Sequence, residues 1–144
     1  MTLVINLLQE KGQAVHTVDP GASVYDAIRK MADEDIGSLV VVENGQMAGI
    51  ITERHYARSV ILRGKASANT PVRDIMARRV HCVGPEDSLE TCMAIMTESR
   101  VRHLLVMQGE DLVGLISIGD VVKAIISEQK FIIEELVHFV GGGR

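Results

Sequence analysis

The sequence predicts a mixed α+β fold, in which two small mixed sheets each have their own helices. Three observations indicate it. Residues 15–57 align without a gap with residues 80–122, so the chain contains one unit twice. Within each copy, short β-branched runs alternate with amphipathic stretches of helical periodicity. Each copy is too small to bury its own hydrophobic face, so the two are expected to pack on each other.

Identity between the two copies exceeds what composition alone would give, which is roughly three identical pairs. Many further positions are apolar in both copies. The ten identical pairs are Val15/Val80, His16/His81, Val18/Val83, Pro20/Pro85, Ser23/Ser88, Met31/Met96, Leu39/Leu104, Val41/Val106, Gly49/Gly114 and Ile51/Ile116.

The first copy has the order β-α-β-β-α. Ser23 is expected to cap its first helix, because a serine hydroxyl can accept a hydrogen bond from an amide of the first turn. Asn44-Gly45 is typical of a hairpin turn, and Thr52 is expected to cap the last helix. The expected elements are a strand at 15–18, a helix from Ser23, strands at 38–43 and 47–52, and a helix at about 53–62.

The second copy has the same order. One difference is expected: the hairpin turn at Gly109-Glu110-Asp111 should be looser than the turn at Asn44-Gly45. The expected elements are strands at 80–83, 103–107 and 112–117, a helix at 88–98, and a helix that starts at Ile118.

Three segments lie outside the repeat. Residues 2–9 are expected to form a short amphipathic helix, and Thr70-Pro71 to open a short helical turn over 72–76. The last helical pattern continues past the repeat and leaves an apolar stripe without a partner there: Phe131, Ile132, Leu136 and Phe139. The predicted division is 1–63 for the lead helix and first repeat, 64–71 for a linker, 72–128 for the second repeat, and 129–144 for a C-terminal helix and glycine-rich tail.

Composition argues against several classes of protein. Of the 144 residues, 47% are hydrophobic, which excludes a disordered chain, and no apolar run is long enough to cross a bilayer. The net charge of −4 disfavours a binder of nucleic acid duplexes, and the absence of tryptophan leaves few aromatic faces for single strands. No basic, cleavable secretory signal is seen at the start of the sequence. We therefore expect a cytoplasmic protein with no nucleic acid or membrane partner.

Short motifs at matched positions carry a resemblance to a known family. They comprise residues 15–18 and 49–54 in the first copy, and 101–106 and 114–120 in the second. Together they resemble a tandem pair of CBS domains, as found in stand-alone regulatory proteins. The resemblance extends over most of the chain. It implies two repeats packed about a pseudo-two-fold axis, two clefts for adenine nucleotides, and association of two chains as a homodimer.

The strand-to-helix junction of the second copy is the strongest candidate for a nucleotide site. Ser117 ends a strand and starts a helix, so its hydroxyl and the amides of Ile118 and Gly119 would face outward together, as suits a phosphate. Asp120, in the first turn, could accept hydrogen bonds from two ribose hydroxyls. A plainer alternative stays open, in which Ser117 only caps the helix and Asp120 only complements its dipole.

The matching junction of the first copy departs from the family's pattern. Thr52 corresponds to Ser117, but His55 stands where the family has its ribose-binding aspartate. Imidazole has at most one acceptor nitrogen, so it cannot accept hydrogen bonds from both hydroxyls of one ribose. This site is expected to bind nucleotide weakly or not at all. Two questions stay open here. His55 could be only a solvated residue of the first turn, and Arg54 could either bind a phosphate or be only a surface cation.

Two basic side chains precede the central strand of the second copy. Arg102 could grip phosphate oxygens through two hydrogen bonds, and His103 could add a donor. The alternative is that they only shield a strand edge against aggregation. The resemblance adds contacts from residues of the first strands: Thr17, His81 and Val83. No cluster of cysteine and histidine has metal-ligand spacing, so no metal site is expected.

The sequence thus predicts a regulatory protein that binds AMP, ATP or NAD, acts as a homodimer, and signals to an unidentified effector protein. Two alternatives stay open. One is a ligand-independent interaction module that uses the C-terminal helix, and the other is an NADH or redox sensor that responds through Cys82. Motifs for a nucleophile elbow, a Walker loop or a zinc protease are missing, so neither an enzyme nor a catalytic cofactor is expected.

Overall fold

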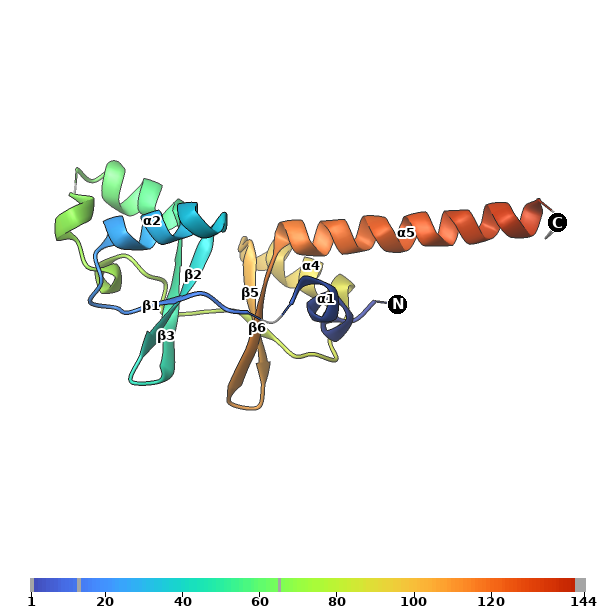
Figure 1. Cartoon of the computed structure of the whole chain (residues 1–144), viewed down its shortest axis with the longest axis horizontal. Helices are drawn as coiled ribbons and strands as arrows, with labels where there is room; N and C mark the ends of the chain where they lie inside the picture. Colours follow the sequence, from blue (N-terminus) through green and yellow to red (C-terminus); the bar gives the residue numbers. More distant parts are fainter. Residues whose placement is uncertain (1, 13, 65, 142–144) are drawn as a thin grey trace. The chain divides into compact units, whose positions relative to one another are not determined.

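The structure is a computed structural model that describes residues 2–12, 14–64 and 66–141 (Figure 1). It contains two three-stranded sheets with the strand orders β1-β2-β3 and β4-β5-β6, so the mixed α+β class is confirmed. The chain divides into two compact units. The first-repeat unit consists of residues 14–80, and the second-repeat unit combines the start of the chain with residues from 81 onward.

The first-repeat unit has the predicted order of elements. Strand β1 runs parallel to β2, and β2 runs antiparallel to β3. The first strand is shorter than predicted, and the helix after Thr52 continues into a π-helical turn. The elements are β1 (Thr17–Val18), α2 (Val24–Glu34), β2 (Ser38–Glu43), β3 (Gln46–Thr52), α3 (Glu53–Tyr56), the π-helical turn (Ala57–Ile61) and two 3-10 turns (Ser67–Asn69 and Val72–Asp74).

The second-repeat unit repeats this sheet, with β4 parallel to β5 and β5 antiparallel to β6. The lead helix lies two residues later than predicted at both ends. The last helix is continuous from the repeat into the C-terminal extension. The elements are α1 (Val4–Lys11), β4 (Cys82–Val83), α4 (Leu89–Ser99), β5 (His103–Gln108), β6 (Asp111–Ser117) and α5 (Ile118–Val140).

The predicted N-cap at Ser23 is confirmed, and the matched Ser88 caps α4 in the same way. The hydroxyl oxygen of Ser23 accepts a hydrogen bond from the Asp26 amide at 3.1 Å. That of Ser88 accepts one from the Thr91 amide at 3.1 Å. Each bond satisfies an amide that the first turn leaves without a partner in the helix.

The two hairpins have turns of equal length, so the prediction of a looser second turn is wrong. The strand register leaves two residues in each turn, Asn44-Gly45 and Gly109-Glu110, and Asp111 already belongs to β6. Both Asn44 and Gly45 have positive φ, at 53° and 78°, whereas Gly109 alone does so in the second turn, at 62°. The looser second turn was predicted because it has no Asn-Gly pair. A glycine in the first position of a two-residue turn also permits a tight turn, of type II′.

The segment that precedes each repeat packs on the other repeat. One hydrophobic core holds Val4, Leu7 and Leu8 of α1 together with side chains of the second repeat, and the other holds Val72, Ile75 and Met76 together with side chains of the first. Packing therefore divides the chain differently from the division by sequence order, which grouped the lead helix with the first repeat.

Matching hydrogen bonds show that these two segments are equivalent. The Val4 amide donates to the Asp87 carbonyl at 2.9 Å, and the Val72 amide donates to the Ala22 carbonyl at 2.8 Å. Ala22 and Asp87 are aligned in the repeat, whereas the offset between Val4 and Val72 is three residues longer than that of the repeat. An alignment of the sequence with itself at the single spacing of the repeat therefore does not detect that these two segments correspond.

Helix α5 extends well beyond α1 and α4 (Figure 1). Val121 is buried, but every described residue after position 128 is exposed. Large apolar side chains continue along this part, and those that are at least half exposed include Phe131, Ile132, Ile133, Leu136, Val137, Phe139 and Val140. Within the described ranges, no helix is both long and apolar enough to cross a membrane.

Candidate functional site

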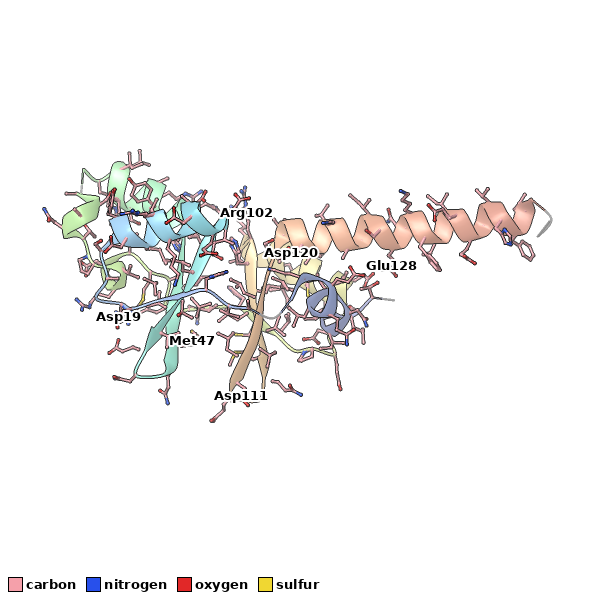
Figure 2. All side chains as sticks on the ribbon, in the orientation of Figure 1. Asp19, Met47, Arg102, Asp111, Asp120 and Glu128 are labelled. Atoms are coloured by element: carbon pink, nitrogen blue, oxygen red, sulfur yellow. The ribbon has the colours of Figure 1, made fainter. Side chains whose placement is uncertain are left out.

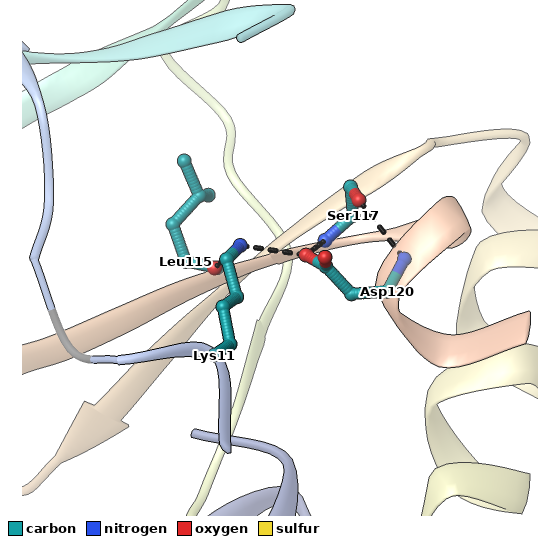
Figure 3. A network of polar contacts seen from close by, with 4 residues as sticks. All are labelled: Lys11, Leu115, Ser117 and Asp120. Carbon is teal, nitrogen blue, oxygen red and sulfur yellow. Dashed lines mark hydrogen bonds and ion pairs between the residues drawn. The ribbon is translucent and has the colours of Figure 1, made fainter. Parts of the chain in front are cut away.

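The junction of β6 and α5 is held by reciprocal hydrogen bonds between Ser117 and Asp120 (Figure 3). The Ser117 hydroxyl oxygen accepts from the Asp120 amide at 3.2 Å, and the Asp120 Oδ2 accepts from the Ser117 amide at 2.9 Å. The Ile118 amide donates to the Arg102 carbonyl at 2.8 Å. The Gly119 amide alone has no partner among the described residues, so it is the first-turn donor that remains for an anion.

Lys11 from the end of α1 joins this junction (Figure 3). Its Nζ lies 2.6 Å from Asp120 Oδ2 and donates to the Leu115 carbonyl at 2.6 Å. Both side chains are partly exposed, with relative accessibilities of 36% for Lys11 and 27% for Asp120. The lysine thus connects the lead helix to the edge of β6 and to Asp120, the residue expected to bind a ribose.

The Asp120 carboxyl is ionised at neutral pH. Burial by itself raises the pKa of Asp120, but hydrogen bonds from Lys11 and the Ser117 amide, with the Lys11 charge, bring the pKa below its ordinary value. Oδ2 receives both of these hydrogen bonds, and neither of the two donors bonds to Oδ1. The carboxylate therefore keeps one oriented oxygen available to accept hydrogen bonds from a ligand.

The first-repeat junction has the same hydrogen-bond pattern with different chemistry. The Thr52 hydroxyl oxygen accepts from the His55 amide at 3.2 Å, and His55 Nδ1 accepts from the Thr52 amide at 3.1 Å. Thr52 therefore caps the helix as predicted, and a ring nitrogen occupies the capping position of the Asp120 oxygen. His55 is half-buried and bonded, so the alternative of a solvated first-turn residue is wrong.

The imidazole of His55 is neutral at physiological pH. Burial lowers its pKa, and the neighbouring charges of Arg54 and Arg58 lower the pKa further. Because Nδ1 accepts from the Thr52 amide, the ring proton is on Nε2, which can only donate. The His55 ring therefore has no acceptor nitrogen left for a sugar hydroxyl. Weak ribose binding at this junction stays a prediction.

Arg102 and His103 lie next to the Ser117 junction. His103 is opposite Ser117 in the register of β5 and β6, and the Arg102 carbonyl accepts from the Ile118 amide. Figure 2 labels Arg102, which directly precedes β5, and Asp120, which lies in the first turn of α5. Arg102 is exposed and His103 is partly buried. The backbone thus brings two basic residues next to Ser117 and Ile118.

The three strand candidates have different environments. The side chain of Val83 belongs to the hydrophobic core, so only its backbone remains for a ligand. The His81 carbonyl accepts from the Leu105 amide at 3.1 Å and continues the parallel pairing of β4. Thr17 is exposed, and its carbonyl accepts from Lys30 Nζ at 2.6 Å. Within the described ranges, none of these three side chains forms a hydrogen bond or ion pair with the junction of its own unit.

Lys11 is the site residue that the sequence analysis did not identify. It lies outside the aligned repeat, 109 positions from Asp120. A lysine in the last turn of an amphipathic helix is common, because it complements the helix dipole. Only the packing of α1 against the second repeat gives this lysine a place at the junction.

The thiols give little support to redox sensing. Burial raises the pKa of Cys82, and burial followed by the charge of Asp87 raises the pKa of Cys92 to about 11. Thiol oxidation proceeds through the thiolate, which both shifts disfavour. Among the residues that the structure describes, no group of three or more histidine, cysteine or carboxylate side chains could hold a metal ion.

Comparison with known proteins gives one consistent result. The family model described as CBS domain matches residues 13–61 and 72–127. A curated relative, the CBS domain-containing protein CBSX3, mitochondrial, from Arabidopsis thaliana, is 36% identical over 99% of this chain and 73% of that protein.

Solved structures agree with the sequence comparison. A putative signal-transduction protein with CBS domains from Burkholderia ambifaria MC40-6 is 47% identical, with a TM-score of 0.86, and the match covers 89% of this chain and 96% of that one. The CBS-domain containing protein ATU1752 from Agrobacterium tumefaciens is 39% identical, with a TM-score of 0.81, over 85% of this chain and 98% of that one.

Proposed function

Because the chain belongs to the CBS-domain family, a family of regulatory modules, we propose that it senses an adenine nucleotide, which it binds at the Ser117–Asp120 junction. AMP, ATP and NAD are the candidate ligands, and each carries an adenosine with two adjacent ribose hydroxyls. The observation that carries the proposal is the Asp120 carboxylate, which is ionised, held by Ser117 and has Oδ1 available. Hydrogen bonds from hydroxyls to a carboxylate are among the strong ones.

The groups around Asp120 suit the phosphate of the same ligand. The Gly119 amide points from the positive end of a 23-residue helix. Arg102 can grip phosphate oxygens in bidentate fashion, and His103 can donate a further hydrogen bond. The proposed role is non-catalytic: occupancy of the site would change the affinity of the protein for an effector protein.

Substitution of Asp120 tests the site. Asp120→Asn keeps the size of the side chain and removes its charge, and a hydrogen bond to a charged group contributes about 1.5–3 kcal/mol. We expect calorimetry to show at least about a tenfold loss of AMP affinity. The matched control is Asp19→Asn, which changes a carboxylate that accepts from the Gly21 amide at 2.7 Å in the other unit. Wild-type affinity in Asp120→Asn would refute the site.

We further propose that the protein acts as a homodimer through α5. At 100° per residue, Ile126, Ile133, Leu136 and Val140 share one face of the helix. All four are more than half exposed. Phe131, included in the predicted stripe, lies on the opposite side. A continuous exposed apolar face of this kind is typical of an interaction surface. It also favours the second candidate function, a protein-interaction module that uses α5 without a ligand.

Light scattering tests the dimer. The double variant Ile133→Glu/Leu136→Glu places charges on the apolar face and is expected to reduce the mass from that of a dimer to that of a monomer. Phe131→Glu is the matched control, because it adds a charge at an equally exposed position on the opposite side, and it should stay dimeric. A monomeric wild-type protein at micromolar concentration would contradict the proposal. The effector is proposed to be a protein, and the location to be cytoplasmic.

A further inference from the structure

The contact between Lys11 and Asp120 has a consequence for ligand binding. Two donors, the Lys11 ammonium and the Ser117 amide, already bond to Oδ2. A carboxylate oxygen has two lone pairs, so a third donor to Oδ2 has no good position. A ribose that engages both carboxylate oxygens must therefore remove one of the two donors. The Ser117 amide is fixed by the backbone at the end of β6, which leaves the lysine.

Lys11 has a second partner that it can keep. Its ammonium also donates to the Leu115 carbonyl at the edge of β6. The aligned carbonyl of the first-repeat unit, that of Ile50, accepts instead from the Ala77 amide at 2.8 Å. In that unit a backbone amide satisfies the strand edge, and no described lysine contacts His55. The double contact of Lys11 is thus a feature of the second-repeat unit.

We propose that Lys11 is an internal competitor for the ribose: it occupies the Asp120 carboxylate in the ligand-free protein and is displaced when adjacent hydroxyls bind. This inference rests on the proposed nucleotide site. It makes Lys11 a residue that determines specificity, because only the hydrogen bonds of two adjacent hydroxyls compensate for the loss of the ion pair. The helix that carries Lys11 is anchored in the core by Val4, Leu7 and Leu8, so the competitor is held close to its target.

Lys11→Met tests the proposal, since methionine approximates the length of lysine and has no donor. The probe is adenosine, which carries no phosphate and so does not respond directly to the lost charge. Dissociation constants are measured from amide chemical shifts in a nuclear magnetic resonance titration. A partly exposed ion pair contributes up to about 1 kcal/mol, so Lys11→Met should bind adenosine about fivefold more tightly than the wild type.

Three controls separate competition from a general effect. 2′,3′-Dideoxyadenosine lacks both hydroxyls, and its affinity should be the same in the wild type and in Lys11→Met. Lys11→Arg keeps a cation and should stay close to wild-type affinity for adenosine. Lys30→Met removes a lysine that donates to the Thr17 carbonyl in the other unit, and it should also leave adenosine binding unchanged.

The outcomes distinguish this inference from the proposed function. Adenosine binding that is unchanged or weaker in Lys11→Met, with saturable binding to the wild type, overturns the competitor and leaves the nucleotide site intact. An equal gain for dideoxyadenosine also overturns it, because the effect would not depend on the hydroxyls. No saturable binding of adenosine or AMP to either protein overturns both proposals.

Discussion

The two strand-to-helix junctions have the same pattern of capping hydrogen bonds. They differ in their capacity to accept hydrogen bonds from a ligand. At the second-repeat junction, the side chain three residues after the cap is Asp120, an ionised carboxylate with Oδ1 available. At the first-repeat junction it is His55, a neutral imidazole whose acceptor nitrogen is used by Thr52. The comparison shows that two repeats can keep the same capping hydrogen bonds with side chains of different acceptor chemistry.

The charges around the two junctions also differ. The carboxylate of Asp120 is paired with Lys11, a residue from outside the repeat. His55 has Arg54 and Arg58 beside it, and their positive charges disfavour protonation of the imidazole. The first junction therefore has two cations beside a neutral ring, whereas the second has one cation paired with a carboxylate.

The largest expected difference between the units is at the matched glycines. A Cβ on Gly49 would overlap the Ala77 carbonyl oxygen, whereas a Cβ on Gly114 would lie 2.7 Å from a terminal carbon of Leu8. A backbone atom bonded to β3 cannot move away as a leucine side chain can. We expect Gly49→Ala to lower the free energy of unfolding by about 3 kcal/mol and Gly114→Ala by about 1 kcal/mol, measured by urea denaturation.

Gly84→Ala serves as the control for the glycine comparison. Its nearest neighbour would lie 3.7 Å from the new Cβ, an ordinary contact, so its stability should stay close to that of the wild type. Equal losses for Gly49→Ala and Gly114→Ala would show that the two glycines are packed by equally rigid neighbours.

The next effect is the conversion of one junction into the other. His55→Asp replaces the donor imidazole by a carboxylate in the same capping position, and we expect nucleotide affinity at the first repeat to rise at least about tenfold. Chemical shifts of residues in β3 and α3 would report binding. His55→Asn retains an acceptor for the Thr52 amide without a charge and should show no such gain. Two equivalent tight sites in the wild-type protein would contradict the distinction between the junctions.

The smallest expected effect is on the pH dependence of stability. A lowered histidine pKa means that the unfolded chain binds the proton more readily than the folded one. The contribution of neutral His55 is therefore complete above the ordinary pKa of 6.5 and is lost as pH falls through the folded pKa. The contribution of Asp120 is complete above 3.8 and is lost only as pH falls through its own lowered pKa.

Urea denaturation between pH 7.5 and 5 checks this difference. His55→Asn should reduce the loss of stability on acidification in that range, whereas Asp120→Asn should leave the slope unchanged. The four other histidines are present in both variants, so they cancel in the comparison. A slope that responds to Asp120→Asn and not to His55→Asn would reverse the assignment.

Features determined by local sequence were predicted well. Ser23 and Thr52 cap helices because their hydroxyls lie next to the amides that they satisfy. The Asn44-Gly45 turn follows from the positive φ angles that these residues tolerate. The Gly109-Glu110 turn was misjudged because a different pair of residues reaches the same turn length by another backbone conformation.

Features that depend on distant parts of the chain could not be predicted. Helix α1 precedes the first repeat but packs in the core of the second repeat. No local sequence pattern shows on which of the two repeats α1 will pack. Lys11 reaches Asp120 through this packing alone. The acceptor chemistry of Asp120 could be predicted from the sequence, but its ion pair with Lys11 could not.

The most direct test of the account is a thermodynamic cycle between Asp120 and the ribose. AMP and its 2′,3′-dideoxy analogue are titrated by calorimetry against the wild-type protein and Asp120→Asn. If the carboxylate binds the hydroxyls, the wild type should lose at least about tenfold in affinity for the analogue, and Asp120→Asn should lose little further. If Asp120→Asn still discriminates strongly between the two ligands, Asp120 is not the sugar ligand and the assigned site is wrong.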